Sequence, residues 1–153
     1  MYKPKVYTAS KIHHHLLWQK MKQDIDWDFI EWTASWVDHP DIPNEQSGED
    51  ILPTVFRDAW MANIADVRRS DFILLYSGGE EALRGALIEA GAGMAYGLNI
   101  VAVGVAESHS WTFHPQVVRM KTLREARDYL YRFTTMVPPN LRGRRRVEDD
   151  QEH

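Results

Sequence analysis

A single acidic residue, Glu89, lies in a stretch of small and apolar residues that runs from Gly85 to Gly97 (GALIEAGAGMAYG). Gly85 precedes Glu89 by one helical turn, so its missing side chain would leave space above the carboxylate. Covalent glycosyl transfer needs a semi-buried carboxylate beside an open space, because the anion stabilises an oxocarbenium-like transition state and can then form an ester with the sugar. The spacing therefore makes Glu89 a candidate nucleophile.

The same stretch also has simpler explanations. Four glycines lie within its thirteen positions, although each glycine inside a helix costs roughly 0.5–1 kcal/mol relative to alanine. Small residues would let the helix lie close to a sheet, which accounts for the glycines without any ligand. A carboxylate on the solvated side of the helix is the corresponding alternative for Glu89.

Two further motifs could bind ions. The turn Ser77-Gly78-Gly79 precedes a predicted helix, whose first N–H groups can hold a phosphate. It lacks both G-x-x-x-x-G-K-[ST] and G-x-G-x-x-G, so it is neither a P-loop nor a dinucleotide fingerprint. His13-His14-His15 resembles a metal tract, but consecutive helical residues point in different directions. The chain has no cysteine, which excludes thiolate ligands, and we expect neither a metal site nor a cofactor.

Strand and helix patterns alternate along the chain and would position these residues. Strands are predicted at 5–9, 29–37, 72–76, 100–105 and 116–120, and helices at 11–23, 51–69, 80–96 and 122–134. Ser10 and Thr122 are the predicted caps of two helices. Apolar strands separated by helices predict a doubly wound α/β fold, a Rossmann-like or flavodoxin-like sandwich with a parallel sheet of about five strands.

Ligands of such folds bind beyond the carboxyl ends of the strands. The predicted strand ends at 9–10, 36–37, 77–78 and 105–106 are therefore expected to share one crevice. This placement makes Ser10, Trp36, Ser77 and Gly78 candidate ligand-binding residues. Trp60, Trp111 and Phe113 are further candidates for a stacking surface, and packing in the core or an interface is the alternative for each aromatic residue.

Length and composition bound the remaining possibilities. The chain of 153 residues is predicted to form one domain, 1–137, followed by a flexible charged tail, 138–153. Lys and Arg number 18 and Asp and Glu 22, so the net charge of −4 gives no reason to expect a nucleic-acid polymer as partner. The apolar stretches fall short of the ~20 residues that cross a membrane, and no signal-peptide pattern is present, so we expect a cytoplasmic protein.

Two segments resemble the nucleoside 2-deoxyribosyltransferase superfamily, which includes nucleoside deoxyribosyltransferases and 5′-nucleotide N-glycosidases. They are SDFILLYSGG and RGALIEAGAGMAYGLNIVAVG, and the resemblance extends to KVYTAS and HPQVVRMKTLREA. It spans most of 5–130, and its specific part is 71–104. It implies a five-stranded parallel sheet, a nucleoside or nucleotide and a nucleobase as small-molecule ligands, no cofactor, and assembly as a homodimer or higher homo-oligomer.

The resemblance assigns roles to individual residues. It places Glu89 at the position of the nucleophile and Tyr7 at that of a first-strand tyrosine whose hydroxyl orients the glutamate. Gly85 matches a glycine four residues before the nucleophile. Asn63 lies where many members have an aspartate that contacts the base, which leaves protonation of the departing base open, and Asp66 could substitute.

Two further positions concern the 5′ end of the sugar and the neighbouring subunit. Leu83 replaces an aspartate that reaches the sugar 5′-hydroxyl in many members of the superfamily. This change suggests that Arg84 or Ser77 contacts a phosphate instead. Gln116 falls where the family often has an amide that a neighbouring subunit inserts into the site.

Three functions therefore compete. The first is a nucleoside 2-deoxyribosyltransferase that moves deoxyribose from one base to another. The second is a hydrolase that cleaves a (deoxy)nucleoside 5′-monophosphate, which Leu83 and Arg84 favour. The third is a non-catalytic nucleotide-binding module, to which Asn63 gives some weight.

Overall fold

Five parallel strands form one sheet in the order β2-β1-β3-β4-β5. The computed structural model describes residues 1–39 and 52–135. Residues 38–50, whose composition predicts a loop between two elements, lie mostly outside the described residues, and so does all of the predicted 138–153 tail. The strands are β1 (Lys5–Ala9), β2 (Glu31–Trp32), β3 (Phe72–Tyr76), β4 (Asn99–Val103) and β5 (Val117–Met120).

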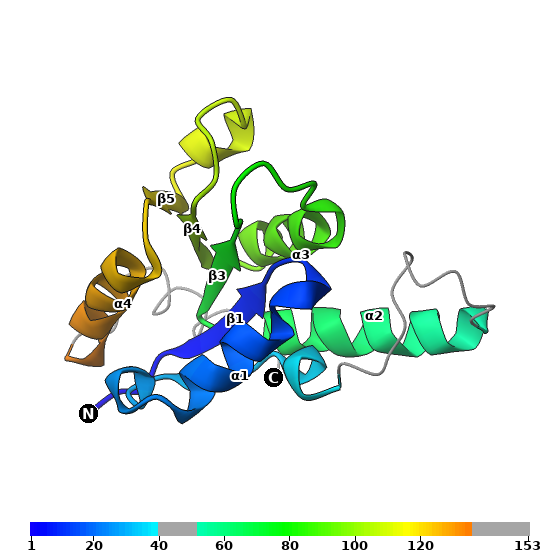
Figure 1. Cartoon of the computed structure of the whole chain (residues 1–153), viewed down its shortest axis with the longest axis horizontal. Helices are drawn as coiled ribbons and strands as arrows, with labels where there is room; N and C mark the ends of the chain where they lie inside the picture. Colours follow the sequence, from blue (N-terminus) through cyan, green and yellow to red (C-terminus); the bar gives the residue numbers. More distant parts are fainter. Residues whose placement is uncertain (40–51, 136–153) are drawn as a thin grey trace, which may run out of the picture.

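Helices lie on both faces of the sheet, so the described residues form one α/β domain of the predicted class (Figure 1). The α-helices are α1 (His15–Gln23), α2 (Pro53–Arg68), α3 (Arg84–Ala95) and α4 (Leu123–Tyr131). Short 3₁₀ helices are η1 (Ile12–His14), η2 (Ile25–Trp27), η3 (Ser35–Asp38), η4 (Ser110–Phe113) and η5 (Arg132–Thr134). Within the described residues, no helix combines the length and the apolar character that a membrane span requires.

The strand register decides which residues face which helices. Tyr7 pairs with Ile73, and Ile73 with Ile100, so these three side chains share one face of the sheet, the face that α3 covers. Phe72 points to the opposite face, where its ring contacts Phe133 of η5, which directly follows α4. In Figure 1, α3 and α4 accordingly lie on opposite sides of the sheet. A side chain at position 7 is therefore directed toward α3.

Small residues let α3 approach the sheet closely. Its buried residues are Ala86, Glu89, Ala90 and Gly93, which recur at helical spacing and form one face. A Cβ atom at Gly93 would overlap the Cδ1 atom of Ile73. Close packing thus accounts for this glycine, as the simpler explanation predicts, but it also places Glu89 on the buried face and not on the solvated one.

Several predicted elements differ from the structure. The second strand is only Glu31–Trp32, and the chain then turns into η3, because the amide of Ser35 donates to a carboxylate oxygen of Asp66 and not to a neighbouring strand. Ser10 does not cap a helix: its hydroxyl donates to the carbonyl of Lys11 and accepts from the indole of Trp18. The predicted cap Thr122 is confirmed, since its side chain accepts from the Glu125 amide.

Gly104, which follows β4, permits a close backbone approach at the carboxyl edge of the sheet. Its φ is +73°, and a Cβ atom there would overlap the carbonyl oxygen of Ser77. Gly97 has a similar φ of +82° but no atom near the same position. We expect Gly97→Ala to cost about 1 kcal/mol, the strain of a left-handed alanine, and Gly104→Ala about 3 kcal/mol, because a steric clash adds to that strain. Urea unfolding of both variants measures this difference, and equal losses would rule the clash out.

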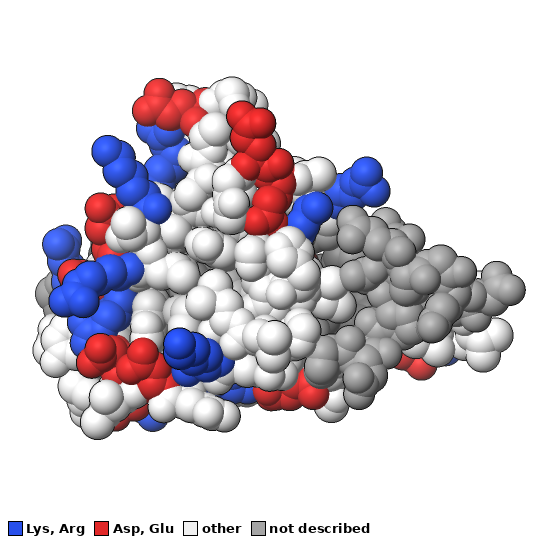
Figure 2. Space-filling view, in the orientation of Figure 1, with Lys and Arg blue, Asp and Glu red and all other residues white. Residues whose placement is uncertain are grey.

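Charges of both signs are mixed on the molecular surface. Figure 2 shows one face, where lysines and arginines alternate with acidic residues around a broad uncharged area. This distribution is in keeping with the small net charge of −4.

Candidate functional site

A cavity of about 390 Å³ lies where β1, β2 and β3 end. The chain passes from β1 outward to β2 and returns past β1 to β3, so the cavity lies at the topological switch point, where open α/β sheets bind ligands. Its described lining residues are Ser10, Lys11, Ile12, His13, Ser35, Trp36, His39, Phe56, Ala59, Trp60, Ala62, Asn63, Ala82, Leu83, Arg84, Gly85, Ala86, Ile88 and Glu89.

Glu89 lies at the floor of this cavity on the sheet-facing side of α3. Its residue exposure is 6%, and it is the only acidic side chain among the described lining residues. Burial raises the pKa of Glu89 to about 8, because the charged form loses solvation there. The carboxyl group is therefore mostly protonated at neutral pH in the ligand-free protein, and it ionises when pH rises or when a cationic group develops beside it.

Tyr7 is the hydrogen-bond partner of Glu89. The residue is fully buried in the middle of β1, and its hydroxyl donates to Oε2 of Glu89 across the interface between sheet and α3. The strand fixes the position of the ring, so the hydroxyl holds the carboxyl group in one orientation. The two side chains that the resemblance assigns to catalysis are thus brought together from positions 82 residues apart.

Two of the four candidate aromatic residues form walls of the cavity. Trp36 is held by its indole N–H, which donates to the carbonyl of Thr8 at a distance of 2.9 Å. Trp60 of α2 lies against Gly85, where an added Cβ atom would stand 3.2 Å from the indole ring. Gly85 therefore makes room for this tryptophan as well as lining the cavity. Trp111 and Phe113 belong to η4 and are not among the lining residues.

Polar and cationic side chains line the cavity beside the carboxylate. Asn63, from α2, and Arg84, the first residue of α3, are both predicted ligand-binding residues that the structure places there. Lys11 and His13 add two basic side chains from the turn after β1. Leu83 lines the cavity too, so the aspartate that it replaces in the resemblance would have faced this same space.

Four predicted ligand-binding residues do not line the cavity. Asp66 accepts from the amide and hydroxyl of Ser35 and from the guanidinium of Arg69, so it holds η3 in place. The side chain of Gln116 donates to the carbonyls of Met94 and Leu98 at the end of α3, a position that binds no cavity ligand within one chain. The other two, Ser77 and Gly78, form the turn after β3.

The turn after β3 is occupied by side chains of the protein itself. The amide of Gly78 donates to Oε1 of Glu81 at 2.7 Å, and the hydroxyl of Ser77 donates to the carbonyl of Gly79. A carboxylate thus takes the place where the sequence predicts a phosphate. A phosphate at this turn would have to displace Glu81.

The sequence analysis named single residues of α2 but did not predict that a whole face of this helix lines the cavity. Phe56, Ala59, Trp60 and Asn63 all line the cavity and recur at spacings of three and four residues. That spacing is visible in the sequence and predicts one helix face, but nothing local shows that this face borders a cavity. Ser35 and His39 were not predicted to line the cavity, because Ser35 lies in the predicted strand 29–37 and His39 in the loop that follows it.

The fold and the site together describe an α/β protein with a five-stranded parallel sheet. A cavity at the switch point of that sheet contains a buried glutamate. No family model, curated protein or solved structure matches the chain.

Proposed function

We propose that this protein is a nucleoside 2-deoxyribosyltransferase-like enzyme that cleaves the N-glycosidic bond of a 2′-deoxynucleoside. The observation that carries the proposal is the pair formed by Glu89 and Tyr7: a buried carboxyl group, oriented by a tyrosine hydroxyl, that lines a cavity of small-molecule size. A solvated helix glutamate would have neither the burial nor the partner.

The proposed reaction proceeds in two half-reactions. The bond between C1′ and the base nitrogen breaks, its electron pair leaves with the base, and the departing base takes up a proton from solvent. The Glu89 carboxylate stabilises the oxocarbenium-like charge on C1′ and then forms an ester bond to that carbon. In the second half-reaction, a nitrogen of another base attacks C1′, loses its proton to solvent and releases the carboxylate.

The cavity supplies what such a substrate needs besides the nucleophile. The indole rings of Trp36 and Trp60 offer flat surfaces for a nucleobase, and the amide of Asn63 can hydrogen-bond its edge. Since Asn63 cannot donate a proton as an acid, it would assist departure of the base by hydrogen bonding alone. The burial that raises the Glu89 pKa also limits the access of water to this carboxyl group, which favours transfer over hydrolysis.

A second candidate function, hydrolysis of a (deoxy)nucleoside 5′-monophosphate, is favoured by the charges of the cavity. Lys11 and Arg84 both line it, while Glu89 is the one acid among its described lining residues. Two cations with Leu83 in place of an acid suit a phosphate better than a 5′-hydroxyl. The first half-reaction would be the same, and water would replace the acceptor base.

Incubation with deoxyinosine or dCMP, with and without adenine as acceptor, tests these functions. Formation of deoxyadenosine from deoxyinosine supports transfer. Release of cytosine from dCMP without any acceptor supports the 5′-monophosphate hydrolase. Binding of either compound without base release over many hours would contradict both enzyme proposals and indicate a non-catalytic nucleotide-binding module.

Tyr7→Phe is expected to lower the rate of base release by about 10- to 100-fold. Loss of the hydroxyl removes a hydrogen bond to the charged form of Glu89, so the pKa of that carboxyl rises further and the rate increases only at higher pH. The pH profile of kcat/KM measures both effects. Tyr76→Phe is the matched control, since Tyr76 lies on the opposite face of the sheet. Equal rates and equal pH profiles for the two variants would contradict the role of Tyr7.

A further inference from the structure

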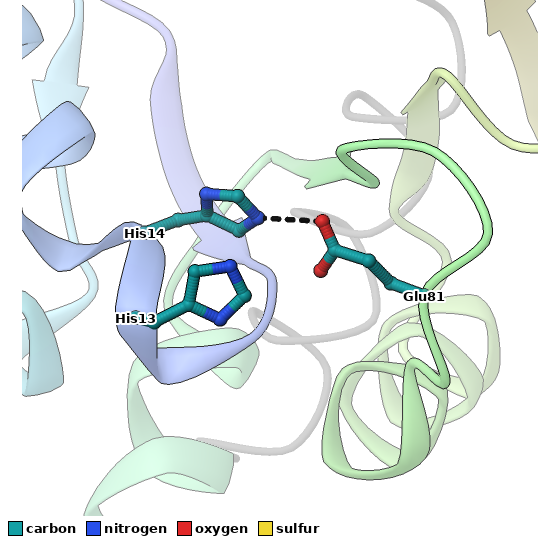
Figure 3. A group of neighbouring side chains, drawn as sticks. All are labelled: His13, His14 and Glu81. Carbon is teal, nitrogen blue, oxygen red and sulfur yellow. Dashed lines mark hydrogen bonds and ion pairs between the residues drawn. The ribbon is translucent and has the colours of Figure 1, made fainter.

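Three potential metal ligands meet beside the cavity but outside the glutamate–tyrosine pair. His13 and His14 belong to η1, directly after β1, and Glu81 belongs to the loop between β3 and α3. Figure 3 shows both imidazole rings directed toward the Glu81 carboxylate from the neighbouring segment. One ligand atom from each residue lies within 4.8 Å of the other two, and Nε2 of His14 is 2.8 Å from Oε1 of Glu81.

The carboxylate of Glu81 has one oxygen in use and one available. Oε1 accepts from the amide of Gly78 and contacts His14, whereas Oε2 is buried and has no hydrogen-bond partner among the described residues. A buried carboxylate oxygen without a partner is costly. The Glu81 carboxylate faces the two imidazole rings from the opposite segment.

We propose that His13, His14 and Glu81 form a binding site for a divalent transition-metal ion of the Zn²⁺ type. Two imidazole nitrogens and one carboxylate oxygen are a ligand set that zinc accepts, with bond lengths of about 2.0–2.2 Å and a fourth position left for water or a ligand. Ligand atoms of such a tetrahedron stand about 3.3 Å apart, so small side-chain rotations bring the three present residues into that geometry. Oε2 of Glu81 gains a partner in the process.

The sequence alone could not show this site. The third histidine of the tract, His15, directs Nδ1 to the carbonyl of Ile12, so it belongs to a separate hydrogen bond. The missing ligand is Glu81, which lies 67 positions after His14. Although His13 and His14 are adjacent in η1, their ring centroids lie 4.0 Å apart and both rings face Glu81 (Figure 3).

A bound ion would join two segments that border the cavity. The turn after β1 contributes Lys11 and His13 to the lining, and the loop before α3 leads into Leu83 and Arg84. A metal held by both segments would fix this wall of the cavity and stabilise the folded protein by mass action. The three ligands differ from the residues proposed for glycosyl transfer, so metal binding can be tested independently of that function.

Calorimetric titration of the full chain, prepared without an added histidine tag and stripped of metal, tests the site with ZnCl₂. We expect one ion per chain and an increase in Tm with zinc concentration. Co²⁺ should give the visible absorption of a four-coordinate site with nitrogen and oxygen ligands. Glu81→Gln and His13→Gln should each weaken Zn²⁺ binding by about tenfold or more, because each removes one of three ligands.

His15→Gln is the matched control, because it removes a histidine of the same tract that is not one of the three ligands. Its affinity for Zn²⁺ should match that of the unchanged chain. The chain has seven histidines, so equal binding by all three variants would assign the ion to other residues and overturn the proposal, as would an absence of binding to the unchanged chain. Circular dichroism confirms that the variants are folded, which makes loss of affinity attributable to the missing ligand.

Discussion

Glu89→Gln is expected to abolish release of the base, with a loss of kcat/KM of about 1,000-fold or more. The amide has the shape of the carboxyl group and can still accept the hydrogen bond from Tyr7, so the cavity keeps its form. It carries no negative charge for the developing oxocarbenium ion and cannot form the ester. The loss should therefore appear in kcat, while the affinity for substrate stays close to that of the unchanged enzyme.

The matched control for this variant is Glu80→Gln, which makes the same chemical change at an exposed residue just before α3. We expect its activity to stay within about twofold of the unchanged protein, as is usual for surface substitutions that touch no special feature. Steady-state rates of base release for the three proteins decide the matter. Activity of Glu89→Gln close to that of the control would remove Glu89 from the mechanism and end both enzyme proposals.

The parts of the fold that the sequence predicts correctly are those with strong local signals. The strands Lys5–Ala9 and Phe72–Tyr76 match their predicted bounds, because Phe72–Tyr76 is a short apolar run between polar residues and Lys5–Ala9 is rich in the β-branched and aromatic residues that favour strands. The cap at Thr122 is equally local. The predicted second strand, 29–37, is too long. Its residues alternate as in a strand, but the amide of Ser35 donates to Asp66, and this side chain comes close only once α2 has packed in place.

The same distinction holds for the site. Glu89 stands out as one acid in an apolar helix, and Tyr7 is found through a resemblance, so both can be named before the structure is known. The position of Glu81 over the Gly78 amide depends instead on how a loop of irregular conformation folds back, and the sequence of the turn suggests only a phosphate. Likewise, the cavity face of α2 depends on its packing beside α3, which gives no local signal.

The burial of Glu89 also predicts how the stability of the protein depends on pH. Its pKa is about 8 in the folded chain and close to the ordinary 4.5 once unfolding exposes it. Between these values the folded state holds a proton that the unfolded state releases. The contribution of Glu89 to stability is therefore fully present below pH 4.5, declines by about 1.4 kcal/mol for each pH unit above it, and is lost once pH passes 8.

Glu89→Gln removes this titration, so the variant should become more stable than the unchanged protein as pH rises. We expect the difference in unfolding free energy to grow from near zero at pH 5 to about 4–5 kcal/mol at pH 8 and then level off. Urea unfolding from pH 5 to 9, with Glu80→Gln as the control, measures it, and parallel curves for both variants would show that Glu89 is not buried as described. Since only the ionised carboxylate can attack C1′, activity should increase over the same pH range in which stability falls. The folded protein would then lose stability at high pH because the ionised Glu89 carboxylate, the form that the reaction needs, is kept away from water.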